Sequence, residues 1–126
     1  MKINIIEIYK NEEEIKKIVE RIKGYSFKDF KKTFHFEFSI LEKASDIDLL
    51  NKTFTRFELI KSIELRENER GEKHYGFHYE LEDGTFVTIA LALDKNPPLI
   101  INGIHSKVNY KRFEKSLRKN YKDKFI

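Results

Sequence analysis

The stretch His74-Tyr-Gly-Phe-His-Tyr-Glu-Leu-Glu-Asp-Gly-Thr-Phe-Val-Thr-Ile-Ala-Leu-Ala-Leu93 decides the fold of this chain. Aromatic and polar residues alternate up to Glu82, and an apolar run begins at Phe86, so a strand stands on each side of Asp83-Gly84. An Asp-Gly pair is typical of the two-residue type I′ turn that joins antiparallel strands. The sequence therefore predicts a β-hairpin over residues 74–93.

The two faces of the first hairpin strand differ in character. Tyr75, Phe77 and Tyr79 share one face, which we expect to be buried in the core. His74 and His78 lie on the other face, which we expect to be more exposed to solvent.

The periodicity of apolar residues predicts the other helices and strands, on both sides of the hairpin. Alternating or β-branched runs predict strands over residues 2–9, 33–41, 55–66 and 99–104. Caps followed by apolar stripes predict helices over residues 11–24, 45–54 and 109–121. Short turns between the later strands make that part of the sheet antiparallel. We therefore predict a single α+β domain, residues 1–126. Its antiparallel meander sheet of about five to six strands would pack against an N-terminal amphipathic helix, with a short middle helix and a basic C-terminal helix.

Charge is distributed unevenly along the chain. The last 22 residues hold eight Lys or Arg against two acids, a net charge of +6, while the other 104 hold 17 against 19, a net charge of −2. This asymmetry favours an anionic partner, with nucleic acid (RNA above all) as the first candidate. Phosphates would be bound by cations of the tail and by one upstream arginine: Arg56, Lys107, Lys111, Arg112, Lys115, Arg118 and Lys119. The backbone N–H groups of the helix capped by Asn109 are a further candidate for phosphate binding.

Several classes of protein are excluded or disfavoured by composition. The chain has no cysteine, which excludes disulfides, thiolate chemistry and cysteine-bound zinc. The N-terminus lacks the apolar core of a signal peptide, and no apolar run is long enough to span a membrane, so we expect a cytoplasmic protein with no membrane partner. Nucleotide-binding motifs are absent, so no cofactor is expected. His74 and His78 would be about 13 Å apart on a strand, too far to share a metal ion.

A few residues suit acid–base chemistry. His78 beside Glu80 could move protons at neutral pH, and His105, between the last strand and the basic helix, could supply a second proton-transfer group. Arg56 and Lys107 could stabilise the developing charge. Metal-independent RNA cleavage requires this set of groups. The alternative is that the histidines are solvated or hydrogen-bonded residues of a hairpin surface.

In element order and charge, the chain resembles small ribonuclease toxins of the RelE and barnase kind, which also place helices before an antiparallel sheet. That resemblance implies metal-independent cleavage of RNA. A second hypothesis is a non-catalytic interaction module, such as a phage- or plasmid-type inhibitor of a nucleic-acid enzyme, with a protein partner and no turnover. A third is a curved-sheet pocket of the cystatin-like type, with a small ligand between the first helix and the sheet. The oligomeric state stays open.

Overall fold

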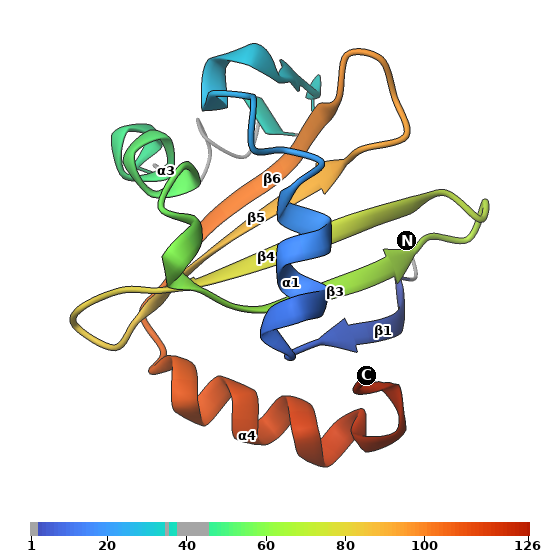
Figure 1. Ribbon diagram of the computed structural model, residues 1–126, viewed down its shortest axis with the longest axis vertical. Coiled ribbons are helices and arrows are strands. Elements are labelled where there is room, and N and C mark those ends of the chain that lie inside the picture. Colours follow the sequence, from blue (N-terminus) through green and yellow to red (C-terminus); the bar gives the residue numbers. More distant parts are fainter. Residues whose placement is uncertain (1–2, 35, 38–45) are drawn as a thin grey trace.

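The computed structural model describes residues 3–34, 36–37 and 46–126. Within them, strands form one mixed sheet in the order β1-β3-β4-β5-β6-β2 (Figure 1). The strands are β1 (Asn4–Tyr9), β2 (Lys31–Lys32), β3 (Ile60–Glu67), β4 (Lys73–Glu80), β5 (Phe86–Ala92) and β6 (Leu99–Ser106). All neighbours are antiparallel except β2 and β6. The predicted α+β class is confirmed, but only β3 to β6 form a simple meander.

Three α-helices of the described residues surround this sheet. They are α1 (Glu12–Val19), α3 (Ile47–Phe54) and α4 (Tyr110–Asn120), and short 3₁₀ turns occur at Phe27–Asp29, Phe57–Leu59 and Lys122–Lys124. Asn11 and Asn109 cap α1 and α4 as predicted, because each side chain accepts hydrogen bonds from the first turn. Asp46 caps α3; Ser45 lies outside the described residues. Figure 1 shows α1 crossing in front of the sheet, with α4 running below it.

The main core lies between α1 and the sheet. Ile15, Ile18 and Ile22 pack against the odd-numbered residues of β4, and Phe77 and Tyr79 are completely buried there. This confirms the predicted aromatic core face for Phe77 and Tyr79, whereas Tyr75 is half-buried against the same core. This packing also fills the space between the first helix and the sheet, where the pocket hypothesis had placed a ligand.

The hairpin at Asp83-Gly84 forms, but its turn is not the predicted type I′. The N–H of Leu81 donates to the carbonyl of Thr85, and the N–H of Gly84 donates back to Leu81. Gly84 has φ +87°, so the loop holds three residues and ends in a glycine bulge. The carboxylate of Asp83 accepts the backbone N–H of Thr85 and fixes this geometry.

Two predicted strands are wrong in part. Phe34, Phe36 and Glu37 are helical, so the strand predicted over 33–41 is wrong in its described part, and residues 35 and 38–41 lie outside it. The hydroxyl of Thr33 accepts the N–H of Phe36, as the cap of a helical turn does. The strand predicted from residue 55 begins only at Ile60, after the 3₁₀ turn.

Candidate functional site

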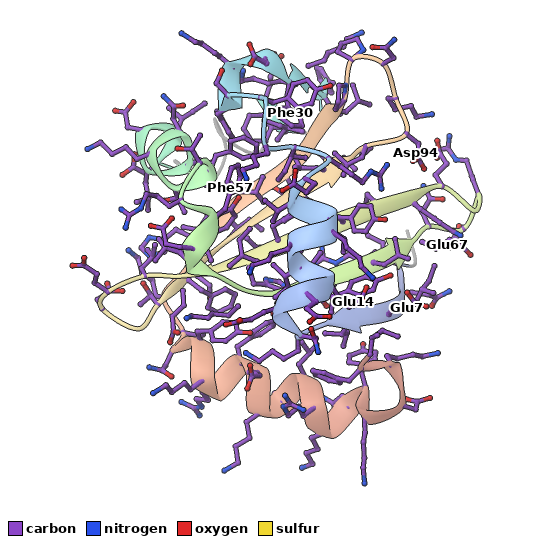
Figure 2. All side chains as sticks on the ribbon, viewed as in Figure 1. Glu7, Glu14, Phe30, Phe57, Glu67 and Asp94 are labelled. Atoms are coloured by element: carbon purple, nitrogen blue, oxygen red, sulfur yellow. The ribbon has the colours of Figure 1, made fainter. Side chains whose placement is uncertain are left out.

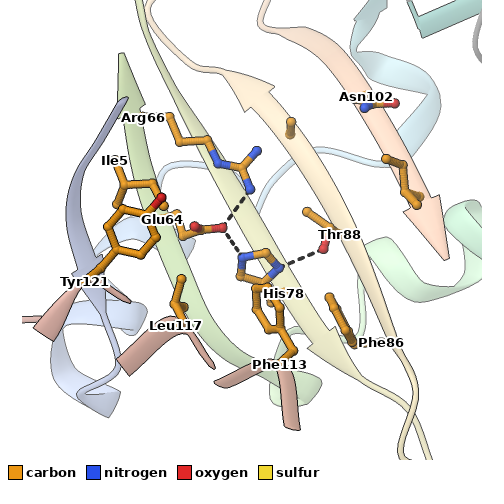
Figure 3. Close-up of a pocket in the computed structure, with 12 residues that line it drawn as sticks. Ile5, Glu64, Arg66, His78, Phe86, Thr88, Asn102, Phe113, Leu117 and Tyr121 are labelled. Carbon is orange, nitrogen blue, oxygen red and sulfur yellow. Dashed lines mark hydrogen bonds and ion pairs between the residues drawn. The ribbon is translucent and has the colours of Figure 1, made fainter. Parts of the chain in front are cut away.

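A cavity of about 350 Å³ lies between the sheet and α4, on the face opposite α1 (Figure 3). Side chains alternate along a strand, so the even-numbered residues of β3, β4 and β5 share this face. Glu64, His78 and Thr88 therefore meet on three neighbouring strands. Phe113 and Leu117 of α4 line the cavity from the other side.

Four residues that line this cavity form a continuous hydrogen-bonded series, Arg66–Glu64–His78–Thr88, which we call the polar chain. Nε2 of His78 donates to Oε2 of Glu64, and Nη2 of Arg66 donates to the same oxygen over 2.7 Å. Nδ1 of His78 is then free to accept the Thr88 hydroxyl, at 2.7 Å. Figure 3 shows the series crossing three strands.

The electrostatics of the polar chain follow from burial and pairing. Burial alone would raise the pKa of Glu64, but the hydrogen bond from His78 and the ion pair with Arg66 lower that pKa to about 2. Complete burial lowers the pKa of His78, and the opposing effect of Glu64 does not offset it. At neutral pH the polar chain therefore holds a carboxylate, a guanidinium and a neutral imidazole.

Carboxylate, imidazole and hydroxyl follow one another here in the order of a hydrolytic triad. The surroundings differ from those of a nucleophile, because Thr88 lies in the middle of β5, paired with His78 on one side and Ile104 on the other. The neighbouring backbone groups are engaged in the sheet, whereas an oxyanion needs free N–H donors. The geometry supports a structural role for Thr88, as a partner that satisfies the buried imidazole.

The expected exposure of the histidine face is wrong. His74 is 7% exposed and His78 is 2% exposed. The rings of Phe86 and Phe113 cover His78, and the Phe113 centroid lies 4.9 Å from that of the imidazole. A histidine covered in this way cannot reach the backbone of an RNA in this conformation.

His105 lies on the other face of the sheet from His78. Residues paired across neighbouring strands share a face, and Val87 pairs with both Tyr79 and His105 while Thr88 pairs with His78. The two histidines predicted to share one reaction are therefore separated by the sheet. His105 instead hydrogen-bonds the Thr85 hydroxyl through Nε2, at 2.9 Å.

The remaining predicted groups are dispersed. Glu80 shares the face of His78 but lines a separate surface cavity with Lys111. Arg56 is exposed and forms an ion pair with Glu58 at 2.6 Å. Lys107 lies beside His105, with Nζ 3.3 Å from Nδ1. The structure thus brings Lys107 to His105, but it does not bring either of them to His78.

The start of α4 is occupied by the protein itself. Oδ1 of Asn109 accepts the N–H groups of Lys111 and Arg112, and the N–H of Tyr110 donates to the carbonyl of Gly84. These are the donors that a helix N-terminus offers to an anion. The predicted phosphate site at these N–H groups is therefore wrong in this conformation.

The outer face of α4 carries a dense group of cations. At 3.6 residues per turn, positions 111, 115 and 119 form one row with 112 and 118 beside it. All five are exposed: Lys111, Arg112, Lys115, Arg118 and Lys119. Figure 2 shows long nitrogen-tipped side chains projecting from α4 away from the sheet. We call these five residues the basic face.

The basic face is largely unneutralised. The only carboxylate of α4 is Glu114, which pairs with Lys10 of the neighbouring chain segment and lies 3.7 Å from Arg118. Among the described residues, no carboxylate lies within ion-pair distance of the other four cations of this face. The exposed side of α1 and of the turn that follows it differs, because a Glu14–Lys17 pair in the helix and a Glu20–Lys23 pair after it balance the charges there.

Sequence reasoning missed Glu64, Arg66 and Thr88 as partners of His78. Glu64 and Arg66 lie on the polar side of a predicted strand, where solvent is the expected neighbour, and Thr88 lies within the apolar run that begins at Phe86. One signal was present: the basic helix has an apolar stripe that must pack on some surface, and the main core already used the other face of the sheet. That requirement could have placed the histidine face under the helix.

Comparisons with family models, with curated proteins and with solved structures find no match for this chain. In the part of the chain that the structure describes, no three His, Cys, Asp or Glu side chains are grouped as metal ligands. None of the helices within these ranges has the length and apolar character needed to cross a bilayer.

Proposed function

We propose that this chain is a nucleic-acid-binding protein that contacts phosphates through the basic face of α4. The observation that carries the proposal is the row of exposed cations without carboxylate partners on that helix. Such a row neutralises phosphates and releases counterions, which gives affinity that depends on charge and carries no sequence preference.

The energetics of α4 favour a ligand for this face. Lys111, Lys115 and Lys119 follow one another at i, i+4 spacing, where like charges destabilise a helix by about 0.2–0.5 kcal/mol per pair. The inner side of the helix is fixed by Tyr110 and Leu117, which are buried. Phosphates bound to the outer side would remove the repulsion without disturbing this packing.

The test is fluorescence anisotropy with a labelled single-stranded RNA, in EDTA and at low salt. We expect the triple variant Lys111→Glu, Lys115→Glu, Lys119→Glu to bind at least about tenfold more weakly than the wild type, because it removes three phosphate contacts. The matched control reverses three exposed lysines away from α4, namely Lys28, Lys31 and Lys52, and should bind almost as the wild type does.

Two outcomes would change the proposal. If the wild type does not bind RNA or DNA at all, the basic face serves an acidic protein instead, in line with the interaction-module hypothesis. RNA recovered from the assay is also run on a gel. Intact RNA agrees with binding alone, whereas cleavage that is lost in His78→Ala would restore the ribonuclease hypothesis for His78.

A further inference from the structure

A second cavity, of about 480 Å³, lies on the same face of the sheet and adjoins the first. The two cavities share Arg66, Ala90 and Asn102 among their lining residues. Its volume falls within the range of small-molecule sites, roughly 300–1,000 Å³. Exposed Ile3 and half-buried Ile101 give it apolar walls.

His74 is an unusual component of this cavity. The residue is 93% buried, and among the described residues no hydrogen bond to its imidazole is found. The described residues also contain no fully buried side-chain nitrogen or oxygen that lacks a partner, so the ring nitrogens of His74 keep some accessible surface, and His74 lines the cavity. Ring nitrogens that have accessible surface and no protein partner are available to hydrogen-bond a ligand in the cavity.

The absence of a side chain at Gly76 makes room for the guanidinium of Arg66. A Cβ on Gly76 would lie 2.7 Å from Cζ of Arg66, so glycine is what lets the guanidinium lie against β4. One donor of Arg66 is used by Glu64, which lines only the adjoining cavity. A guanidinium has five donors, so Arg66 has others to offer to a carboxylate.

A β-bulge completes the site. Ala90 pairs with Asn102 and Leu91 with Ile100, so Ile101 is the extra residue in β6. Bulges re-aim side chains, and both Ile101 and Asn102 line the cavity. Oδ1 of Asn102 accepts the N–H of Gly103, which leaves its amide N–H₂ as a donor.

We propose that this cavity binds a small monocarboxylate with an apolar body, its carboxylate held by Arg66, His74 and Asn102. These three donors come from three strands and line the same cavity as Ala90, whose small side chain takes up little of its space. Ile3 and Ile101 contact the apolar body. The described lining holds no carboxylate to repel the ligand.

The probe for the test is hexanoate. Hexanol is its uncharged counterpart, and acetate is its truncated counterpart. Each compound is titrated into the protein while the backbone amide NMR shifts are recorded. Hexanoate should bind at least about tenfold more tightly than either counterpart, since hydrogen bonds to a charged group and burial of the chain both contribute. Shifts should centre on Arg66, His74 and Asn102.

Variants separate the site from non-specific binding. Arg66→Gln and His74→Phe should each weaken hexanoate binding at least about tenfold, and Ala90→Leu should abolish it by filling the space. Arg70→Gln, at an exposed turn, is the matched control and should change nothing. His74→Phe keeps a ring in the same place, so it tests recognition even if Arg66→Gln unfolds the protein. Equal binding of hexanol and hexanoate, no saturable binding of hexanoate, or unchanged affinity in Ala90→Leu would overturn the proposal.

Discussion

At the scale of single residues, Glu64 lines the first cavity and forms an ion pair with Arg66, which lines both cavities. Its carboxylate is 4% exposed and accepts hydrogen bonds from Arg66 and His78. A buried carboxylate is stable only when its charge is compensated, and here two donors from adjacent strands provide that compensation. Removing the charge should therefore change how the stability of the fold depends on pH.

The first prediction concerns Glu64→Gln. Because the pKa of Glu64 falls from the usual 4.5 to about 2, the carboxylate stabilises the folded state above about pH 4.5, and this contribution is lost as pH falls toward 2. Urea denaturation near neutral pH and at about pH 3 should show a smaller decrease in unfolding free energy for Glu64→Gln than for the wild type.

The control is Glu82→Gln, an exposed position whose decrease should match that of the wild type. If Glu64→Gln lost as much stability in acid as the control, the carboxylate would not be compensated by its two neighbours in the way the structure shows.

Residue-scale sequence reasoning could find His78 but not its surroundings. Alternation placed His74, His78 and Glu80 on one face of a strand, and that assignment holds. Whether this face is exposed to solvent or buried depends on which helix covers it, and no local sequence pattern contains that information. Likewise, the separation of His78 from His105 follows from strand register, which only the assembled sheet reveals.

At the scale of elements, α4 has two separate tasks. Its inner side covers the polar chain with Phe113 and Leu117, and its outer side presents the basic face. The ring of Phe113 stacks on Phe86 with centroids 4.6 Å apart, so the helix is fixed by aromatic packing as well as by its cap.

The second prediction is that Leu117→Ala destabilises the protein by about 2–5 kcal/mol, because it removes a side chain that is 5% exposed and leaves a cavity over the polar chain. Ser116→Ala, one position away on the exposed side, should change the unfolding free energy by less than about 0.5 kcal/mol. Thermal or urea unfolding measures both. Similar stabilities for the two variants would mean that α4 is not docked on the sheet.

Elements with strong local signals were predictable from the sequence. An element for which side-chain capping and β-propensity favour different structures was not. The caps at Asn11 and Asn109 defined two helices from the sequence, and the hairpin followed from its Asp-Gly turn. The segment after Lys32 has alternating phenylalanines, but the Thr33 hydroxyl starts a helical turn there. Side-chain capping thus outweighed β-propensity, which depends more strongly on context.

At the scale of the whole molecule, the charge asymmetry of the sequence becomes a spatial asymmetry. The C-terminal segment forms α4 and the 3₁₀ turn after it. It ends beside β1, where the N–H of Ile126 donates to the carbonyl of Ile8. Its cations therefore stay on one side of the molecule instead of forming a free tail. A fixed basic surface can attract a polyanion and orient it.

The most direct measurement is the salt dependence of RNA binding, comparing the wild type with the Lys111, Lys115 and Lys119 charge reversal and with the Lys28, Lys31 and Lys52 control. Each phosphate contact on single-stranded nucleic acid contributes about −0.7 to the slope of log K against log salt. We expect the α4 variant to lose about two units of slope together with most of its affinity, while the control keeps both. Equal slopes and affinities for the two triple variants would contradict a phosphate-binding basic face.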